Sequence, residues 1–168
     1  GNTKNQGPAS GMALEIFSKE SKDVERLNIV NSVMTGTIPK KKGDALVGYD
    51  FASKLGIEVG DTITYFGTTM NSAMTFQNFV VSGTVRFGQS ALDKGAIIID
   101  ISDAQTMLDM EDGAGEILGY LNDGVYVDEK AKQIADEFNA KNTDANDEFS
   151  PIMLRLKEQN NLASYIDY

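Results

Sequence analysis

The chain has 168 residues, of which 41% are hydrophobic and 24% charged, a balance typical of folded globular proteins. It contains no histidine, cysteine or tryptophan. Imidazole bases, thiol nucleophiles and the usual nitrogen and sulfur ligands of zinc are therefore excluded. The formal net charge of −10 at pH 7 opposes binding to nucleic-acid phosphates. The residues indicate a binding or mechanical module rather than a catalyst, so we expect no enzyme activity, no cofactor and no nucleic-acid partner.

The negative charge is concentrated in the last third of the chain. Residues 1–99 hold ten basic and nine acidic side chains, whereas residues 100–168 hold five basic and sixteen acidic ones. Such a shift often accompanies a change of module. The pattern predicts a leader that is disordered or tag-derived, a mainly β-rich subdomain and an α/β subdomain, over residues 1–11, 12–110 and 111–168.

The first half of the chain reads mainly as strands and turns. The region 21–34 fits neither the helical nor the strand period. Gly56 can close the helix in this half as a left-handed C-terminal cap. The other expected elements are a strand at 12–17, a buried strand at 44–48, a helix at 49–55 and a strand at 62–66.

A hairpin is the clearest prediction. Residues 79–87 alternate between apolar and polar side chains, which predicts a half-buried strand with a bulge at Gly83. This strand pairs with 62–66 through the polar connection 67–75. The alternation places Val81 inside and Thr84 outside, so an aspartate is expected to be far more disruptive at position 81 than at position 84.

Helical patterns become more frequent towards the C-terminus. Ser102 is expected to cap a short helix that ends near Gly113, and Asp128 to cap a longer one. The remaining expected elements are strands at 95–101, 116–121 and 152–156. The last two strands with the Asp128 helix resemble a βαβ unit, so the whole chain is predicted to be α+β, with a small antiparallel β-rich subdomain and a βαβ-type α/β subdomain.

Candidate chemical sites are few. Six carboxylates could supply oxygen ligands to Ca²⁺, but their spacing does not match an EF-hand loop, and no metal site is predicted. The six are Asp100, Asp103, Asp109, Glu111, Asp112 and Glu116. Met70, Asn71 and Met74 lie in the hairpin connection, where flexible apolar side chains can contact a partner, and folding back onto the sheet is the alternative.

A family resemblance is visible between residues 45 and 110. The run ALVGYDFASKLGIEVGDTITYF, the strand 79–87 and the run KGAIIIDISDAQTMLDM resemble the MacB-like periplasmic core domain of FtsX-like and lipoprotein-releasing ABC transporter permeases. Gly56, Gly60 and Asp61 form the turn motif in this pattern. They make structural sense as turn residues and imply no catalytic role.

The resemblance implies a non-catalytic periplasmic domain of a bacterial inner-membrane permease. Its implied role is mechanotransmission: ATP-driven motion of the membrane part is coupled to export or extraction of a lipoprotein, peptide or drug. The implied partners are the permease's own membrane helices, a cytoplasmic ATPase subunit acting indirectly, a second permease chain in a homo- or heterodimer, and an extracytoplasmic partner or substrate protein. The segment 160–168 would then approach a membrane helix outside this chain. The strand and helix that usually open domains of this family are not identifiable in residues 1–30, so the resemblance also implies an α/β subdomain that is incomplete at its N-terminus or has a diverged opening.

Two other functions are compatible with the residues. The first is a free-standing secreted or surface binding module whose acidic surface binds a cation or a peptide. The second is a hydrolase that uses a carboxylate pair, although the chain lacks tryptophan for stacking a sugar.

Overall fold

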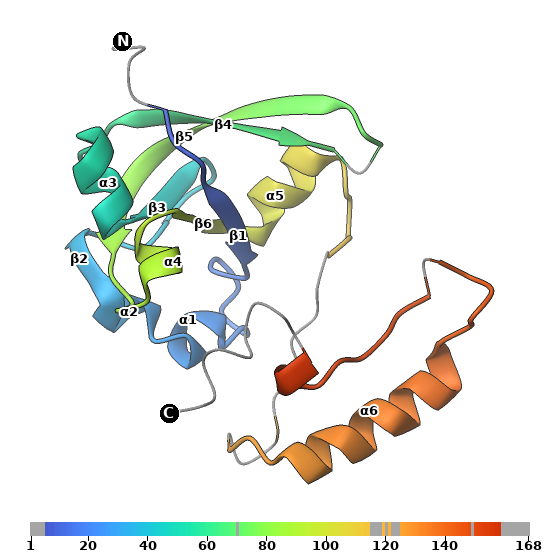
Figure 1. Cartoon of the computed structure of the whole chain (residues 1–168). Coiled ribbons are helices and arrows are strands. Elements are labelled where there is room, and N and C mark those ends of the chain that lie inside the picture. Colours follow the sequence, from blue (N-terminus) through green and yellow to red (C-terminus); the bar gives the residue numbers. More distant parts are fainter. Residues whose placement is uncertain are drawn as a thin grey trace. The chain divides into compact units, whose positions relative to one another are not determined.

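The computed structural model describes residues 6–69, 71–114, 119, 121, 125–148 and 150–158. The chain divides into two compact units, Gly1–Gly115 (unit 1) and Glu116–Tyr168 (unit 2), and each is described by itself. Figure 1 shows the course of the chain.

Unit 1 contains strands and short helices that alternate along the chain. The strands are β1 (Ser10–Leu14), β2 (Val33–Gly36), β3 (Asp44–Gly48), β4 (Thr62–Thr68), β5 (Met74–Val85) and β6 (Ala96–Asp100). The helices are α1 (Asp23–Arg26), α2 (Ile29–Ser32), α3 (Tyr49–Leu55), α4 (Ser90–Asp93) and α5 (Ile101–Leu108). The ambiguous region after β1 therefore forms two short helices followed by a strand.

The strands of unit 1 form one mixed sheet with the order β1-β6-β3-β5-β2, and β4 pairs with β5 outside this path. The pairs β1–β6 and β3–β5 are parallel, whereas β3–β6, β2–β5 and β4–β5 are antiparallel. The α+β class predicted from the sequence is confirmed. The sheet is mixed rather than purely antiparallel, because α3 and the following β4 carry the chain from β3 across to the parallel strand β5.

Both faces of the sheet are covered by apolar side chains. On one face, α3 and α5 pack against β3, β5 and β6; on the other, Ile29 of α2 packs against Leu46, Val85 and Ile98. Every residue of β3 and β6 is buried, as expected for strands in the interior of a sheet covered on both sides. These two strands are short, continuous apolar runs in the sequence, which is why they were predictable.

The predicted bulge is present one residue from its expected position. In the pairing of β3 with β5, Ala45 lies opposite Val81 and Leu46 opposite Gly83, so Ser82 is the extra residue. An extra residue reverses the direction of all following side chains. Val81 therefore faces α3, whereas Val85 belongs to the cluster on the opposite face of the sheet.

The expectation that Thr84 points to solvent is wrong. Its side chain is 4% exposed, and its hydroxyl lies 2.7 Å from that of Thr35 on β2. The prediction failed because β2 covers this part of β5, and because the bulge at Ser82 interrupts the simple alternation. An aspartate at this position would bury a charge, so it is not a mild substitution.

Helix ends in unit 1 follow local chemistry. Helix α3 ends at Gly56, which adopts the left-handed conformation with φ +66° and ψ +37°. The predicted cap at Ser102 is wrong: the cap is Asp100, two residues earlier, and it accepts a hydrogen bond from the Ser102 N–H, so that α5 begins at Ile101. The helix ends at Leu108, before the predicted end near Gly113, because Asp109 adopts a left-handed conformation.

Unit 2 contains α6 (Asp128–Asn142) and a 3-10 turn, η1 (Leu156–Glu158). Helix α6 begins at the predicted place, but Val127 is its N-cap and Asp128 is its first helical residue. The Asp128 carboxylate instead accepts a hydrogen bond from the Tyr126 hydroxyl at 2.7 Å and pairs with Arg155 at 2.9 Å. The prediction overlooked these two partners of the side chain, of which Arg155 is distant in the sequence.

The predicted strand at 152–156 is wrong, and with it the second strand of the expected βαβ unit. Residues 150–155 have no strand partner among the described residues, and Ile152 and Leu154 are 64% and 50% exposed. The amide of Asn139 on α6 instead hydrogen-bonds both the N–H and the carbonyl of Met153 at 2.7 and 3.0 Å. The predicted strand 116–121 falls mostly outside the described residues.

Candidate partner-binding surface

The hairpin of β4 and β5 forms a two-stranded ribbon, defined here as residues 62–80. Its register is regular, from Thr62 opposite Val80 to Thr68 opposite Met74. Figure 1 shows the ribbon running over α5 to a turn at its far end. On β4 the side chains alternate: Ile63 and Tyr65 point inward and pack against the core, whereas those of Thr64 and Phe66 are exposed.

The outer face of the ribbon carries an exposed apolar cluster, formed by Phe66, Met74 and Phe76. Phe66 and Phe76 are each 68% exposed and Met74 is 81% exposed. The two rings lie directly opposite one another, with centroids 6.4 Å apart and planes tilted by 44°. A cross-strand aromatic pair contributes roughly 0.5–1.5 kcal/mol beyond its buried area, which holds the two rings in place while leaving one side of them open.

The backbone of β4 has a free edge. The Thr69 N–H donates to the Ala73 carbonyl at 2.7 Å, so in this register Gly67, Tyr65 and Ile63 form the hydrogen-bonded pairs with β5. The N–H and carbonyl groups of Thr64 and Phe66 therefore point away from β5. Within the described part of the chain β4 pairs with β5 only.

The ribbon is uncharged and its two ends are acidic. Residues 62–85 contain no Asp, Glu, Lys or Arg, although 24% of the whole chain is charged. At the base of the ribbon Glu58 and Asp61 are exposed. At its far end the Asn71 side chain donates a hydrogen bond to Asp109 at 3.3 Å, and two further exposed carboxylates, Glu111 and Asp112, follow.

The residues expected to contact a partner lie at this far end. Asn71 and Met74 are both exposed, and Met70 lies outside the described residues. Sequence reasoning missed the two phenylalanines, which together present more apolar surface than Met74. The neighbouring pair Tyr65-Phe66 could have indicated them, since adjacent strand residues point to opposite faces and one aromatic of such a pair must lie outside.

The turn motif connects α3 to the base of the ribbon. After Gly56, the Glu58 N–H donates to the Asp61 carboxylate at 2.8 Å. Gly60 has φ +96°, a conformation that side chains other than glycine rarely adopt, and its N–H donates to the Val81 carbonyl at 2.8 Å. The Asp61 carbonyl in turn accepts from the Val81 N–H at 2.8 Å, so the motif fixes where β4 leaves the sheet.

The buried carboxylates bind backbone rather than a ligand. Asp44 and Asp93 accept hydrogen bonds from backbone N–H groups of nearby loops, and so does the less buried Asp103. Asp100 accepts from Ile16, Phe17 and Ser102 at 2.9–3.0 Å. Burial alone would raise the pKa of Asp100, but the bonds from Ser102, Phe17 and Ile16 outweigh it and lower the pKa below its ordinary value of 3.8.

No cluster of three metal-binding side chains occurs among the described residues. Of the six carboxylates considered for Ca²⁺, Asp100 and Asp103 bind backbone amides, and Glu116 lies outside the described part. The structure does not bring the remaining three together with them as a ligand set.

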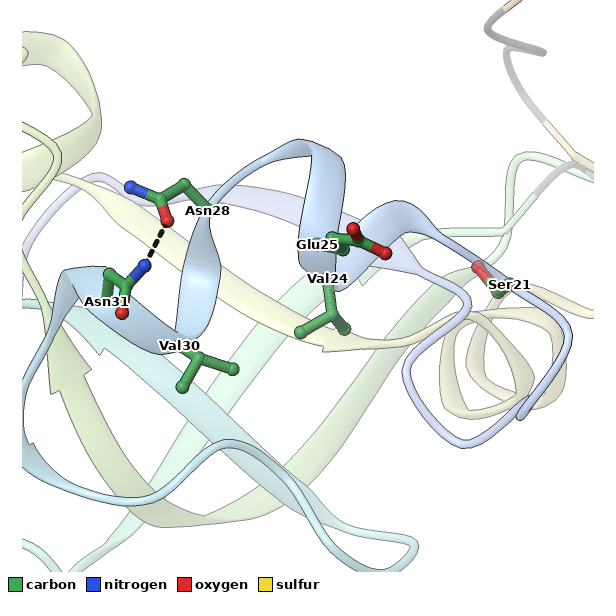
Figure 2. A pocket seen from close by; sticks show the side chains of 6 residues that line it. All are labelled: Ser21, Val24, Glu25, Asn28, Val30 and Asn31. Carbon is green, nitrogen blue, oxygen red and sulfur yellow. Dashed lines mark hydrogen bonds between the residues drawn. The ribbon is translucent and has the colours of Figure 1, made fainter.

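A shallow hollow lies beside α1 and α2 (Figure 2). It is lined by Ser21, Val24, Glu25, Asn28, Val30 and Asn31. The amides of Asn28 and Asn31 bond each other at 2.6 Å, which occupies one donor and one acceptor of the lining. Glu25 is the only ionisable group among these six residues, so the lining offers no pair of carboxylates for acid–base catalysis.

These observations define a class of protein. A rigid mixed sheet carries an uncharged ribbon with exposed aromatic side chains, and its buried carboxylates hold loops in place. These features favour a binding or mechanical domain over a catalytic one. The family model described as MacB-like periplasmic core domain matches residues 18–137, and the chain belongs to this family.

Domains of this family are typical of ABC transporter permeases, where they are non-catalytic and belong to the periplasmic side. The resemblance found in the sequence is therefore confirmed, together with its implied permease context. A search of curated proteins found no match to the chain. Among the described residues, no helix has the length and apolar character needed to span a bilayer.

Proposed function

We propose that this chain is the extracytoplasmic part of a membrane-anchored bacterial ABC transporter permease. In this role it couples ATP-driven movement of the membrane helices to export or extraction of a lipoprotein, peptide or drug. Membership of the MacB-like periplasmic core domain family carries the proposal. The proposed partners are the permease's own helices, a second permease chain in a homo- or heterodimer, and a cytoplasmic ATPase that acts through the membrane part.

The packing of unit 1 supports a mechanical role. Both faces of its sheet are covered, and β3 and β6 are buried along their whole length. Close-packed interiors transmit displacement with little deformation. Unit 1 therefore moves as a rigid body when it is pulled. We further propose that residues 12–110 and 111–168 act as separate mechanical parts.

The gene around this chain tests the membrane context. An apolar stretch of about 20 residues following Tyr168 is expected, since that length crosses a bilayer as a helix. A stop codon directly after Tyr168 would instead favour a free-standing binding module.

Coupling to ATP requires a distance measurement on the full-length permease. This chain has no cysteine, so Ser53→Cys, which is exposed on α3, introduces one label site into it. The distance between the labels of the two permease chains is measured by electron spin resonance with and without ATP, and it should change. A Ser53→Cys, Ser90→Cys pair within unit 1 is the control, and its distance should stay constant. An inter-chain distance that does not change when ATP is added would contradict the coupling role.

A further inference from the structure

We propose that the free edge of β4 binds an extended segment of a partner protein as an additional strand. The segment is uncharged along β4, has apolar side chains on one face, and carries lysine or arginine at its ends. The inference goes beyond the transport role. It rests on the ribbon and does not depend on family membership.

The first argument is the edge itself. Natural edge strands are normally protected from pairing by lysine, proline, a bulge or a cover. β4 has no charged residue and no proline, and its pairing with β5 is regular from Thr62 to Thr68. Its outward N–H and carbonyl groups at Thr64 and Phe66 are spaced to continue an antiparallel or parallel ladder.

The second argument is the side-chain surface next to that edge. Strand addition obtains affinity from backbone hydrogen bonds and specificity from contacts of alternate side chains. Phe66 stands on the edge strand, and Phe76 lies beside it on β5. Apolar side chains on one face of an added strand would lie beside Phe66 and cover part of the exposed surface of this ring pair.

Charge decides which kind of strand fits. The middle of the ribbon offers no ionic partner, whereas Glu58 and Asp61 at one end and Asp109, Glu111 and Asp112 at the other favour cations. A second copy of this chain fits poorly. Two β4 edges paired antiparallel by a twofold axis would place the acidic base of each ribbon beside the acidic far end of the other, and like charges repel.

The test uses the whole chain and a synthetic peptide as the probe. The capped peptide Lys-Thr-Val-Thr-Val-Thr-Lys is titrated into isotopically labelled protein and followed by NMR. Binding should slow hydrogen exchange at the N–H groups of Thr64 and Phe66, which face the added strand, and leave β6 unchanged. A peptide with glutamate at both ends should bind at least about tenfold more weakly, as expected for losing favourable charge contacts.

Two variants at Thr64 distinguish the contribution of its backbone N–H to binding from that of its side chain. Thr64→Pro removes an outward N–H without removing a backbone hydrogen bond to β5, although like Thr64→Val it loses the hydroxyl bond to Asn78, so it should abolish binding. Thr64→Val keeps that N–H and loses only the hydroxyl bond to Asn78, so it should bind like the natural chain. A peptide N-methylated at its central residues gives the same test without altering the protein, in case the proline variant does not fold.

Each other outcome overturns the proposal. Absence of binding, equal binding by the N-methylated peptide, or equal binding by the glutamate peptide would each exclude a charge-selected added strand. A peptide-independent dimer that Thr64→Pro dissociates would assign the edge to a second copy instead. None of these results would affect the transporter assignment, which depends on the family match.

Discussion

The two units of this chain are stabilised by different interactions. Every buried hydrophobic residue in the described chain lies in unit 1, except Ala135 of α6. Unit 2 relies on polar contacts: Arg155 pairs with Asp128 at 2.9 Å and Glu158 at 2.7 Å, and the Asn139 amide holds Met153. Burial of apolar surface gives a cooperative unit, whereas a few partly exposed ionic and amide contacts hold a segment more weakly, and the ionic ones respond to salt.

The largest expected effect is a charge in the core of unit 1. Val81→Asp places a carboxylate on a side chain that is 1% exposed and packs against α3, and it should cost more than about 4 kcal/mol of unfolding free energy. Val80→Asp is the matched control, because the neighbouring side chain points outward and is 41% exposed. Urea unfolding measures both. Similar losses would mean that the two side chains do not face opposite sides.

The next effect tests how closely β2 approaches β5 at Gly83. A Cβ at Gly83 would lie 2.6 Å from the Thr35 carbonyl and 2.7 Å from the Thr37 carbonyl, so Gly83→Ala must displace β2. We expect a loss of about 2–3 kcal/mol. At Gly95 a Cβ would make only ordinary contacts at 3.6 Å, so Gly95→Ala should cost less than about 1 kcal/mol. If both variants unfold at the same urea concentration, β2 does not hold Gly83 tightly.

A smaller effect is expected in unit 2. Asn139→Ala removes both hydrogen bonds to Met153, and should cost about 1–2 kcal/mol of local stability without changing unit 1. Asn142→Ala is the control, since the Asn142 side chain bonds only the Phe138 carbonyl of its own helix in the described structure. Hydrogen exchange at the Met153 N–H distinguishes them. Unchanged exchange in Asn139→Ala would show that the segment is held by something else.

The sequence predicts the elements of unit 1 whose cause is local. β3 and β6 are apolar runs, α3 ends at a glycine, and the β4–β5 hairpin joins two alternating segments. Each strand or helix in this set is itself no longer than a dozen residues, and the two strands of the hairpin are neighbours in the chain, so no knowledge of distant partners is needed. The same local character explains why the resemblance to the family was visible in residues 45–110.

The failures have distant causes. Thr84 is buried because β2 lies beside it, and the face of Val85 depends on the extra residue Ser82. The alternation of residues 152–156 is compatible with a strand, but the amide of Asn139 satisfies the backbone groups of Met153 instead. The exposed pair Phe66–Phe76 was missed for a related reason, because hydrophobicity alone does not show which side of a ribbon is covered.

The smallest expected effect is the pH dependence of stability that comes from Asp100 in unit 1. The pKa of Asp100 is lowered in the folded state, so its hydrogen bonds add stability at neutral pH that is lost as the pH falls from about 3.8 through the folded value. The free energy of unfolding of Asp100→Asn should therefore differ less from that of the natural chain at low pH than at pH 7. Urea unfolding at several pH values between 7 and the acid range measures this difference in unfolding free energy. A difference that does not change with pH would contradict the prediction.

The two units are expected to differ in how salt affects their carboxylates. The pKa of Glu158 in unit 2 is also lowered, by hydrogen bonds from the Arg155 side chain and backbone, but this carboxylate is exposed and its main partner is an ion. Raising the ionic strength from about 0.01 to 1 M shortens the screening length from about 30 to 3 Å and should weaken the Glu158 contribution. The Asp100 contribution should persist, because its partners are backbone N–H groups and one hydroxyl beside a buried side chain. NMR titration of the two carboxyl groups at both salt concentrations measures this directly. If the two pKa values shift with salt to the same extent, the distinction between an apolar unit and an ionic one does not hold.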